Sequence, residues 1–424
     1  MAKPIGPICN LNCSYCFYLE KEKLYPHVNN WVMSDNVLES YIKQYIETQE
    51  IDIVTFAWQG GEPTLLGIDF FKKAIELQKK YCSGKRIENT FQTNGILLND
   101  AWGELFFEND FLIGLSIDGP KELHDKYRVF KGGQPSFEKV MRGLQYLQKH
   151  SVEFNTLTCV QKENSEKPLD VYKFLKEAGS RFMQFIPIVE RAAVNQLDEE
   201  LNPVSPEFEK GAIVSDWSVE PLQYGKFLTA IFDEWVKYDV GKYFVQIFDV
   251  SLEQWYEGSS SLCLFRETCG EALAIEHNGD IYSCDHYVYP KYMLGNILKK
   301  PLFEIVNAAK QYQFGESKKE SLPDYCVQCK VRFACNGGCP KHRFSQTPDG
   351  NRGLNYLCKG YKYFFQHIDV YMKFMSEELK HERAPANVMN WILNKGNTAA
   401  HQNKISRNEL CYCGSGKKYK NCCG

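Results

Sequence analysis

Cysteine placement is the feature of this sequence that most limits what the chain can fold into. The chain has 17 cysteines in 424 residues, and all but Cys82 and Cys159 fall into four groups. The groups are Cys9, Cys13 and Cys16; Cys263, Cys269 and Cys284; Cys326, Cys329, Cys335, Cys339 and Cys358; and Cys411, Cys413, Cys422 and Cys423. The two isolated cysteines are interpreted as small buried hydrophobes. Clustered thiols in a chain of this length indicate metal ligands rather than the bridges of a small disulfide scaffold.

The first group has the spacing Cys9-x3-Cys13-x2-Cys16 and is followed by an aromatic residue, Phe17. Three thiolates on one short loop can hold three irons of a [4Fe–4S] cube and leave the fourth iron open to a small chelating ligand. The alternative is a structural zinc site that lacks one ligand.

Charge and hydropathy exclude two classes of function. The chain has 50 Lys+Arg against 53 Asp+Glu, a formal net charge of −3, so it has no basic field for binding nucleic acid. Apolar runs such as residues 111–115 are far shorter than the roughly 18 residues of a membrane span. The first residues form no apolar signal core, so we expect a cytoplasmic protein.

Runs rich in β-formers alternate with helical patterns along the first half of the chain. Strands are predicted at 53–58, 89–93, 112–117, 153–160 and 182–189, and helices at 69–81 and after an N-cap at Ser136. Strands separated by helices predict an α/β fold with a parallel sheet, open or closed into a partial barrel.

Three of the predicted strands end in glycine next to polar residues. The strand ends read Gly60-Gly61-Glu62-Pro63, Gln92-Thr93-Asn94-Gly95 and Ser116-Ile117-Asp118-Gly119-Pro120. Each could be an ordinary turn, but active sites of such folds lie at the carboxyl ends of the strands. Together with the cysteine loop, the three strand ends predict one site there.

At these residues the chain resembles the radical S-adenosylmethionine (SAM) enzymes with a cysteine-rich auxiliary-cluster domain, and more narrowly the anaerobic sulfatase-maturating enzymes. The resemblance covers residues 3–380 and rests on five strings: CNLNCSYCFYL at 9–19, WQGGEP at 58–63, IFDEWV at 231–236, EHNGD at 276–280 and YSCDH at 282–286. It implies a partial (β/α)6 TIM-like barrel of the radical SAM type at 1–235, with a shorter first strand than is usual, and an auxiliary-cluster (SPASM-type) domain with C-terminal helices at 236–390. A polar linker at 391–405 and a small zinc knuckle at 406–424 are expected to follow.

The resemblance also implies the cofactor and its contacts. A cluster on the first three cysteines would bind SAM and, once reduced, cleave it to a 5′-deoxyadenosyl radical, the difficult part of the chemistry. The turn Gly60-Gly61-Glu62 would meet the amino end of SAM. Ser116 and Arg128 would also face SAM, Arg128 as the fixed cation for its carboxylate, and Tyr15 and Val189 would frame the adenosyl part. Without the motif, Arg128 would be interpreted as a solvated loop charge.

The implied reaction removes hydrogen from Cβ of a Cys or Ser in an unfolded sulfatase and yields Cα-formylglycine. By resemblance Asp285 is the proton acceptor; its neighbour His286 and a plain exposed loop aspartate are the alternatives. A flavodoxin- or ferredoxin-type protein is the expected electron donor, and we expect a monomer. The closest rival activity is another peptide modification, such as a thioether crosslink.

The central cysteines are implied to hold two auxiliary [4Fe–4S] clusters that receive the second electron, which makes three clusters in all. One cluster would take Cys263, Cys269, Cys284 and Cys339, and the other Cys326, Cys329, Cys335 and Cys358. Two zinc sites are the alternative, since four thiolates also suit zinc.

The last 19 or so residues resemble the small zinc-binding (SEC-C) motif at the end of the preprotein translocase ATPase. Its expected zinc ligands are Cys411, Cys413, Cys422 and Cys423. One hypothesis is that this tail brings the enzyme to export-bound sulfatases; the alternative is an accessory knuckle without a specific partner. A non-catalytic zinc-binding interaction protein is the remaining alternative for the whole chain.

Overall fold

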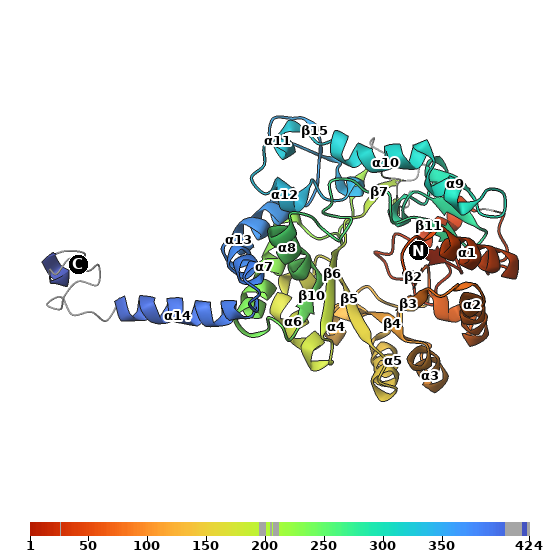
Figure 1. Cartoon of the computed structure of the whole chain (residues 1–424), viewed down its shortest axis with the longest axis horizontal. Helices are drawn as coiled ribbons and strands as arrows, with labels where there is room; N and C mark the ends of the chain where they lie inside the picture. The colour runs from red at the N-terminus through yellow and green to blue at the C-terminus, as the bar shows by residue number, and fades with distance from the viewer. Residues whose placement is uncertain (26, 195–200, 204–205, 207–211, 403–417, 422–424) are drawn as a thin grey trace.

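The fold is built around a ten-stranded sheet (Figure 1). The structure is a computed structural model that describes residues 1–424 except 26, 195–200, 204–205, 207–211, 403–417 and 422–424. The strand order is β10-β6-β5-β4-β3-β2-β1-β11-β12-β13, and the strands from β10 to β11 run parallel to their neighbours. The strands are β1 (Ala2–Lys3), β2 (Ile53–Trp58), β3 (Arg86–Thr93), β4 (Phe111–Ser116), β5 (Phe154–Val160), β6 (Phe182–Pro187), β10 (Phe244–Val245), β11 (Ala274–Glu276), β12 (Asp280–Tyr282) and β13 (Met293–Asn296). The predicted partial parallel barrel is confirmed, with an opening strand of only two residues.

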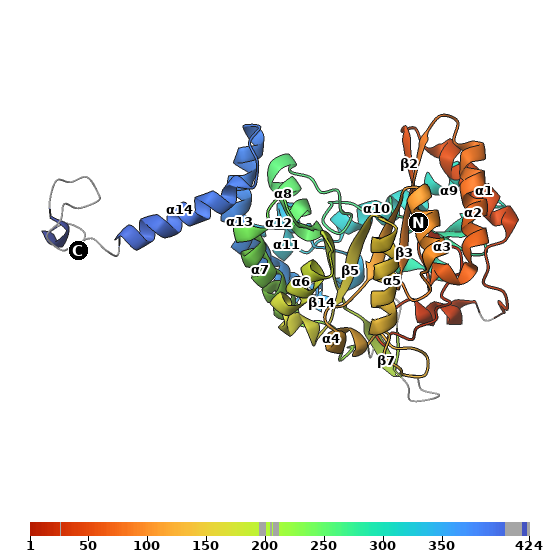
Figure 2. The same cartoon turned by 90° about the horizontal axis from the view of Figure 1, so that it is seen from below.

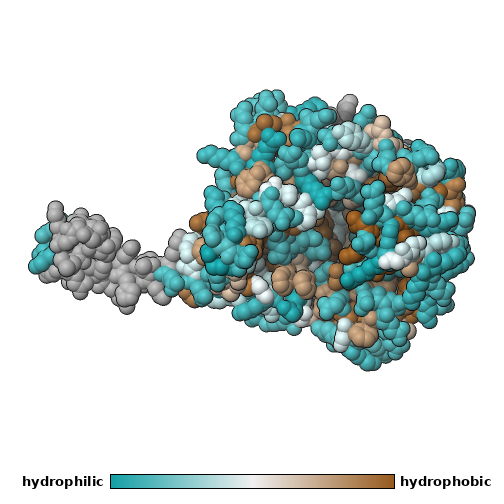
Figure 3. All heavy atoms as spheres, in the orientation of Figure 1, coloured by the Kyte–Doolittle hydropathy of each residue, from teal (hydrophilic) through white to brown (hydrophobic). Residues whose placement is uncertain are grey.

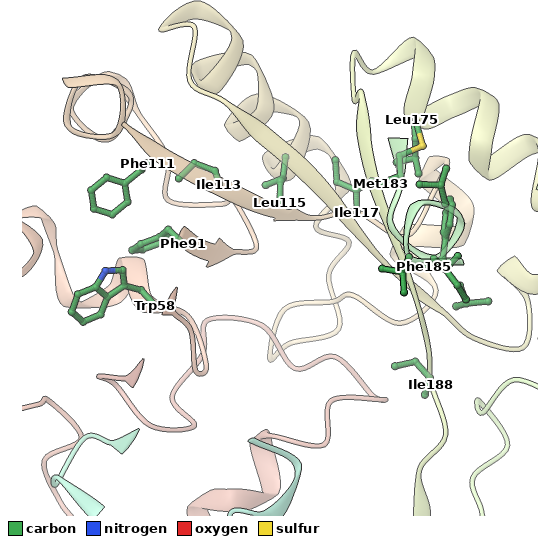
Figure 4. Packing of buried hydrophobic residues seen from close by; sticks show 14 of the residues in the cluster. Trp58, Phe91, Phe111, Ile113, Leu115, Ile117, Leu175, Met183, Phe185 and Ile188 are labelled. Atoms are coloured by element: carbon green, nitrogen blue, oxygen red, sulfur yellow. The ribbon is translucent and has the colours of Figure 1, made fainter. Parts of the chain in front are cut away.

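Helices cover the outer face of this curved sheet (Figures 1 and 2). They are α1 (Asp35–Thr48), α2 (Ile68–Tyr81), α3 (Asp100–Glu108), α4 (Lys121–Asp125), α5 (Phe137–Lys149), α6 (Pro168–Glu177), α7 (Pro221–Tyr238) and α8 (Gln246–Glu257). The main core lies between the two layers, where Trp58, Phe91, Leu115 and Met183 from neighbouring strands belong to one buried cluster (Figure 4). Because strand side chains alternate, the residues between these core positions point into the barrel.

The C-terminal half adds short helices and hairpins beside the barrel. Its elements are α9 (Leu302–Val306), α10 (Ala309–Glu320), α11 (Asp324–Val327), α12 (Arg332–Cys335), α13 (Cys358–Lys380), α14 (Asn387–Gln402), and the pair β14 (Ser345–Gln346) and β15 (Arg352–Leu354). A small separate sheet, β7 (Arg191–Val194), β8 (Leu201–Pro203) and β9 (Ile213–Val214), lies earlier in the chain, between β6 and α7. Single 3-10 turns are η1 (Leu19–Leu24), η2 (Pro63–Leu66), η3 (Asn164–Glu166), η4 (Asp285–Tyr287), η5 (Pro290–Tyr292), η6 (Pro340–His342) and η7 (Tyr419–Asn421).

Helix α13 packs closely on α7, and small residues make this possible. A Cβ on Gly360 would lie 2.0 Å from the carbonyl oxygen of Pro221, and one on Gly225 would lie 2.5 Å from that of Gly360. α14 then extends away from the body of the molecule (Figure 1). The face in Figure 3 is largely hydrophilic, with apolar residues gathered near its centre. None of the helices within the described ranges is long and apolar enough to cross a membrane.

The proposed domain boundaries run through continuous structure. Residue 235 lies inside α7, and β10, beyond that boundary, still pairs with β6 of the barrel. β11, also beyond the boundary, pairs with β1, so the barrel and the cysteine-rich part share one sheet. The stretch 391–405, expected to be a linker, begins within α14 and is helical as far as Gln402.

Two local interpretations are wrong. Ser136 precedes α5, but its hydroxyl donates to the carbonyl oxygen of Arg128 at 2.6 Å. The first helical N–H groups are instead bound by Asp125 Oδ1, which accepts from Ser136 N at 2.9 Å and Phe137 N at 2.8 Å. Cys82 is half-buried, because it follows the last turn of α2 at the surface.

Candidate active site and cluster sites

The cysteine loop that follows β1 is fastened to the segment after α4. Asn12 N donates to the carbonyl oxygen of Val129 at 2.8 Å, and Ser14 N donates to that of Tyr127 at 3.3 Å. Burial is the main cause that raises the pKa of Cys9 to about 12, and the negative charges of Glu62 and Cys16 contribute to this rise.

The three thiols of the loop lie close together. Burial also raises the pKa of Cys13; Arg128 opposes this shift, while the charges of Cys16 and Cys9 add to it. Mutual repulsion of this kind favours binding of a cationic metal centre, whose charge offsets that of the thiolates.

The turn after β2 docks against this loop through its backbone. Gly61 N donates to the carbonyl oxygen of Gly6, and Glu62 N to that of Ile8, both at 2.8 Å. A Cβ on Gly61 would lie 2.0 Å from the Ile8 oxygen, so only glycine fits there. The turn therefore presents main-chain atoms beside Ile8, the residue before Cys9.

The Glu62 side chain links the turn after β2 to a neighbouring strand end through hydrogen bonds. Its fully buried carboxylate accepts hydrogen bonds from Thr64 N and Oγ1, Thr93 Oγ1 and Asn94 N at 2.6–3.1 Å. Burial raises the pKa of Glu62, and these hydrogen bonds oppose the rise. These four hydrogen bonds connect the turn after β2 with the end of β3.

Arg128 and Tyr15 share a buried carboxylate at the end of β4. Arg128 Nε lies 3.0 Å from Asp118 Oδ2, and Tyr15 donates its hydroxyl proton to the same oxygen. Asp118 Oδ1 accepts from Cys159 N at 3.0 Å. Burial alone would lower the pKa of Arg128, but the charge of Asp118 holds it well above its usual value. Arg128 is therefore a permanent, oriented cation rather than a solvated loop charge.

The other predicted SAM contacts lie on neighbouring strand ends. Ser116, at the end of β4, accepts a hydrogen bond from Gln92 Nε2 at 3.0 Å. Val189 is 2% exposed and follows β6 at the same edge of the sheet. The structure therefore brings Gly60, Gly61, Ser116 and Val189 to one edge, that of the cysteine loop.

Asp285 lies directly after Cys284, at the start of η4, and forms an ion pair. Lys3 Nζ, at the end of β1, is 2.5 Å from Asp285 Oδ1. Burial would raise the pKa of Asp285, but the positive charge of Lys3 and, more weakly, that of Lys341 bring it below its ordinary value. The carboxyl is thus ionised and can accept a proton.

His286, the alternative proton acceptor, contacts a cysteine and an aromatic ring. Burial first, and then the charge of Lys341, lower its pKa to about 4. Its Nδ1 lies 3.6 Å from Cys339 Sγ, and its ring packs against Phe17 at 5.6 Å. His286 thus faces a cysteine of the auxiliary region.

Four central cysteines gather beside η4. Burial raises the pKa of Cys284, and the charges of Cys339, Asp285 and Cys263 raise it further. The pKa of Cys269 rises to about 11 through burial, opposed by Lys318 and reinforced by Cys339 and Cys263. The Lys318 ammonium is buried against the carbonyl oxygens of Cys263 and Leu264 at 2.7 and 3.1 Å, which places a positive charge beside the thiols.

The other four central cysteines surround one hollow between α11, α12 and the start of α13. Cys326, Cys329, Cys335 and Cys358 all line it. The pKa of Cys335 is raised to about 12, mainly by burial, and the charges of the other three cysteines contribute to this rise.

The residues present fit three iron–sulfur clusters. Among the described residues no three His, Cys, Asp or Glu side chains converge tightly enough for one metal ion. In a cube each iron takes its own thiolate, so the sulfurs stand farther apart than the ligands of a single ion. The two groupings of central thiols agree with those that the resemblance implies, while ligation stays a prediction. The four tail cysteines, Cys411, Cys413, Cys422 and Cys423, lie outside the described residues.

Sequence comparison gives the chain its family. The radical SAM superfamily profile matches residues 4–175, an iron–sulfur cluster-binding domain matches 263–330 and the SEC-C motif matches 407–424. A serine-type anaerobic sulfatase-maturating enzyme of Bacteroides thetaiotaomicron is 51% identical over 389 residues, 92% of this chain and 94% of the relative. The chain belongs to the anaerobic sulfatase-maturating enzymes. This membership decides against a non-catalytic zinc-binding protein.

Further relatives of this sulfatase-maturating enzyme agree. A cysteine-type enzyme of Clostridium perfringens is 36% identical, over 87% of this chain and 95% of the relative. A solved structure of anSMEcpe with bound AdoMet and the Kp18Cys peptide matches with a TM-score of 0.77 at 34% identity. That match covers 89% of this chain and 98% of the other.

Several residues of the site were not given a role from sequence. The interpretation of Cys159 as a core residue is wrong, because its thiol lies 3.6 Å from Arg128 Nη2. Its neighbours Thr158 and Val160 are fully buried, so strand alternation places Cys159 on the opposite, inner face. That alternation could have revealed it. Lys3 gave no comparable signal, since β1 is too short for any pattern.

Proposed function

We propose that this enzyme oxidises a Cys or Ser side chain of a sulfatase polypeptide to Cα-formylglycine in a SAM-dependent radical reaction. The observation that carries the proposal is the ion pair between Lys3 and Asp285 at 2.5 Å. This ion pair connects β1, which leads into the cysteine loop, with Asp285, the residue that follows Cys284. A proton acceptor therefore stands between the predicted SAM cluster and a predicted auxiliary cluster.

Separate groups of residues hold the cluster and bind SAM. Bound to Cys9, Cys13 and Cys16, a [4Fe–4S] cluster with SAM would supply the 5′-deoxyadenosyl radical. Arg128, held by Asp118, binds the SAM carboxylate, and the Gly60–Gly61 backbone meets its amino group. These contacts orient the cofactor.

Asp285 takes the proton from the substrate thiol or hydroxyl. A carboxylate that is ionised before the reaction can accept this proton without a prior change of state. The eight central cysteines would hold the two auxiliary clusters, which offer an acceptor for the second electron.

The remaining assignments complete the proposal. The substrate is an unfolded sulfatase segment, and the solved relative with a bound peptide supports a peptide ligand. The electron donor is a flavodoxin- or ferredoxin-type protein, and the enzyme works as a cytoplasmic monomer. The tail at 406–424 binds zinc, supported by its match to the SEC-C motif.

Metal content tests this proposal. After anaerobic reconstitution the full chain should hold roughly twelve irons, from three cubes, and about one zinc. Deletion of residues 406–424 should remove the zinc and leave the iron unchanged. Zinc throughout, with little iron, would refute the cluster assignment, whereas zinc retained after the deletion would refute the tail site alone.

A further inference from the structure

Lys3 is a buried lysine that the proposed reaction does not yet use. It is 2% exposed, although a lysine is among the residues least often buried without a partner. Removing an ammonium group from water is costly unless a well-placed anion compensates. A lysine in this position needs a specific partner.

The backbone around Lys3 is fixed on both sides. Lys3 pairs with Glu276 of β11, and Ala2 pairs with both Ile275 of β11 and Trp58 of β2. The amino group of Met1 donates to the carbonyl oxygen of Leu273 at 3.1 Å. The start of the chain is therefore held within the sheet, and Lys3 projects from a rigid base.

The ammonium of Lys3 lies where three segments meet. It is 2.5 Å from Asp285 Oδ1 and 4.4 Å from the centre of the Tyr18 ring. Tyr18 follows the cysteine loop and donates its hydroxyl proton to Glu276 Oε1. These contacts hold the ammonium in one place between the cysteine loop and η4.

Another lysine near Asp285 is engaged elsewhere. Lys341 forms an ion pair with Glu190 at 2.6 Å and lies over the Phe17 ring at 4.5 Å. Within the described part of the chain, Lys3 is thus the lysine in direct contact with Asp285, while the Asp285 side chain keeps 18% of its surface accessible. That accessible part can meet a substrate while Oδ1 is held.

We propose that Lys3 is a positioning residue for formylglycine formation: by binding Asp285 Oδ1 it fixes the carboxylate so that its accessible part receives the substrate proton. This role rests on the proposed function. The proton leaves the substrate sulfur or oxygen and goes to Asp285. Lys3 keeps its own protons and forms no covalent bond.

The test separates positioning from cofactor chemistry. Lys3→Met removes the charge at similar length, and Lys3→Arg restores a cation. Each reconstituted variant is given SAM, reductant and paired Cys- and Ser-type sulfatase peptides, and formylglycine and 5′-deoxyadenosine are both measured. Lys3→Met should lower formylglycine per 5′-deoxyadenosine by about 10- to 100-fold, with SAM cleavage and peptide KM within about twofold of wild type. Lys3→Arg should recover a large part of the ratio.

A matched control is Lys176→Met, which breaks another largely buried Lys–Asp pair, Lys176–Asp239 at 2.8 Å, between α6 and the end of α7. It should leave the product ratio unchanged. An unaltered ratio in Lys3→Met overturns the positioning role, as does an equal loss of both products or a failure of Lys3→Arg to restore the ratio. If the wild type forms 5′-deoxyadenosine but no formylglycine from either peptide, the proposed function fails instead.

Discussion

Alanine at Cys9, Cys13 and Cys16 should abolish SAM cleavage and, with it, all conversion of peptide. These three thiols are gathered on the loop after β1, and the Gly61 backbone closes over the loop at Ile8. Without them no iron with an open position remains to bind SAM, because four-cysteine sites leave no iron open. The production of 5′-deoxyadenosine should fall to the level seen without enzyme.

The measurement is 5′-deoxyadenosine by chromatography, with iron counted on the same sample. The triple variant should retain roughly eight irons, those of the two auxiliary cubes. Cys82→Ala is the matched control, since Cys82 is half-buried after α2 and donates a hydrogen bond to the carbonyl oxygen of Lys79 in its own helix. SAM cleavage that survives the triple substitution would contradict the assignment of the first cluster.

Asp285→Asn should block aldehyde formation while sparing SAM cleavage. The substitution keeps the size of the side chain but removes the base, and a general base contributes about 10²- to 10⁴-fold to a rate. Formylglycine should fall by that factor while 5′-deoxyadenosine continues to form. Mass spectrometry of the peptide, paired with 5′-deoxyadenosine analysis, gives both quantities.

Asp239→Asn provides the control for loss of a buried paired carboxylate. Asp239 accepts from Lys176 and from the Tyr172 hydroxyl, both at 2.8 Å, on the outer layer of the barrel. It should change stability but not the ratio of the two products. If Asp285→Asn forms formylglycine at the wild-type rate, Asp285 is not the proton acceptor.

The barrel could be predicted from sequence because its strands are long enough to carry a pattern. The predicted strand at 53–58 coincides with β2, and the predicted helix at 69–81 differs from α2 by one residue. Glycine at a strand end also had a physical meaning that the structure bears out at Gly61, where a side chain would collide with Ile8. The periodicity of the sequence is therefore sufficient to predict β2 and α2, and the steric requirement for glycine is sufficient to predict the close contact at Gly61.

Contacts between distant segments could not be predicted in the same way. Lys3 meets Asp285 only because β11 returns to pair with β1, and a two-residue strand has no periodicity. Asp118 follows a predicted strand, but its role depends on contacts with Arg128 and Tyr15, which lie on two other segments of the chain. The local pattern at Ser136 predicts a side-chain cap, whereas Asp125, 11 residues earlier in the chain, accepts hydrogen bonds from the backbone at the start of α5.

Formation of formylglycine is the activity expected of this chain. Its most direct test is to incubate the anaerobically reconstituted enzyme with SAM, a reductant and paired Cys- and Ser-type sulfatase peptides. We expect at least one peptide to show the mass decrease that matches formylglycine, together with an aldehyde that reacts with hydrazine, in proportion to 5′-deoxyadenosine. Production of 5′-deoxyadenosine with both peptides unchanged, or with a thioether crosslink in place of the aldehyde, would contradict the claim.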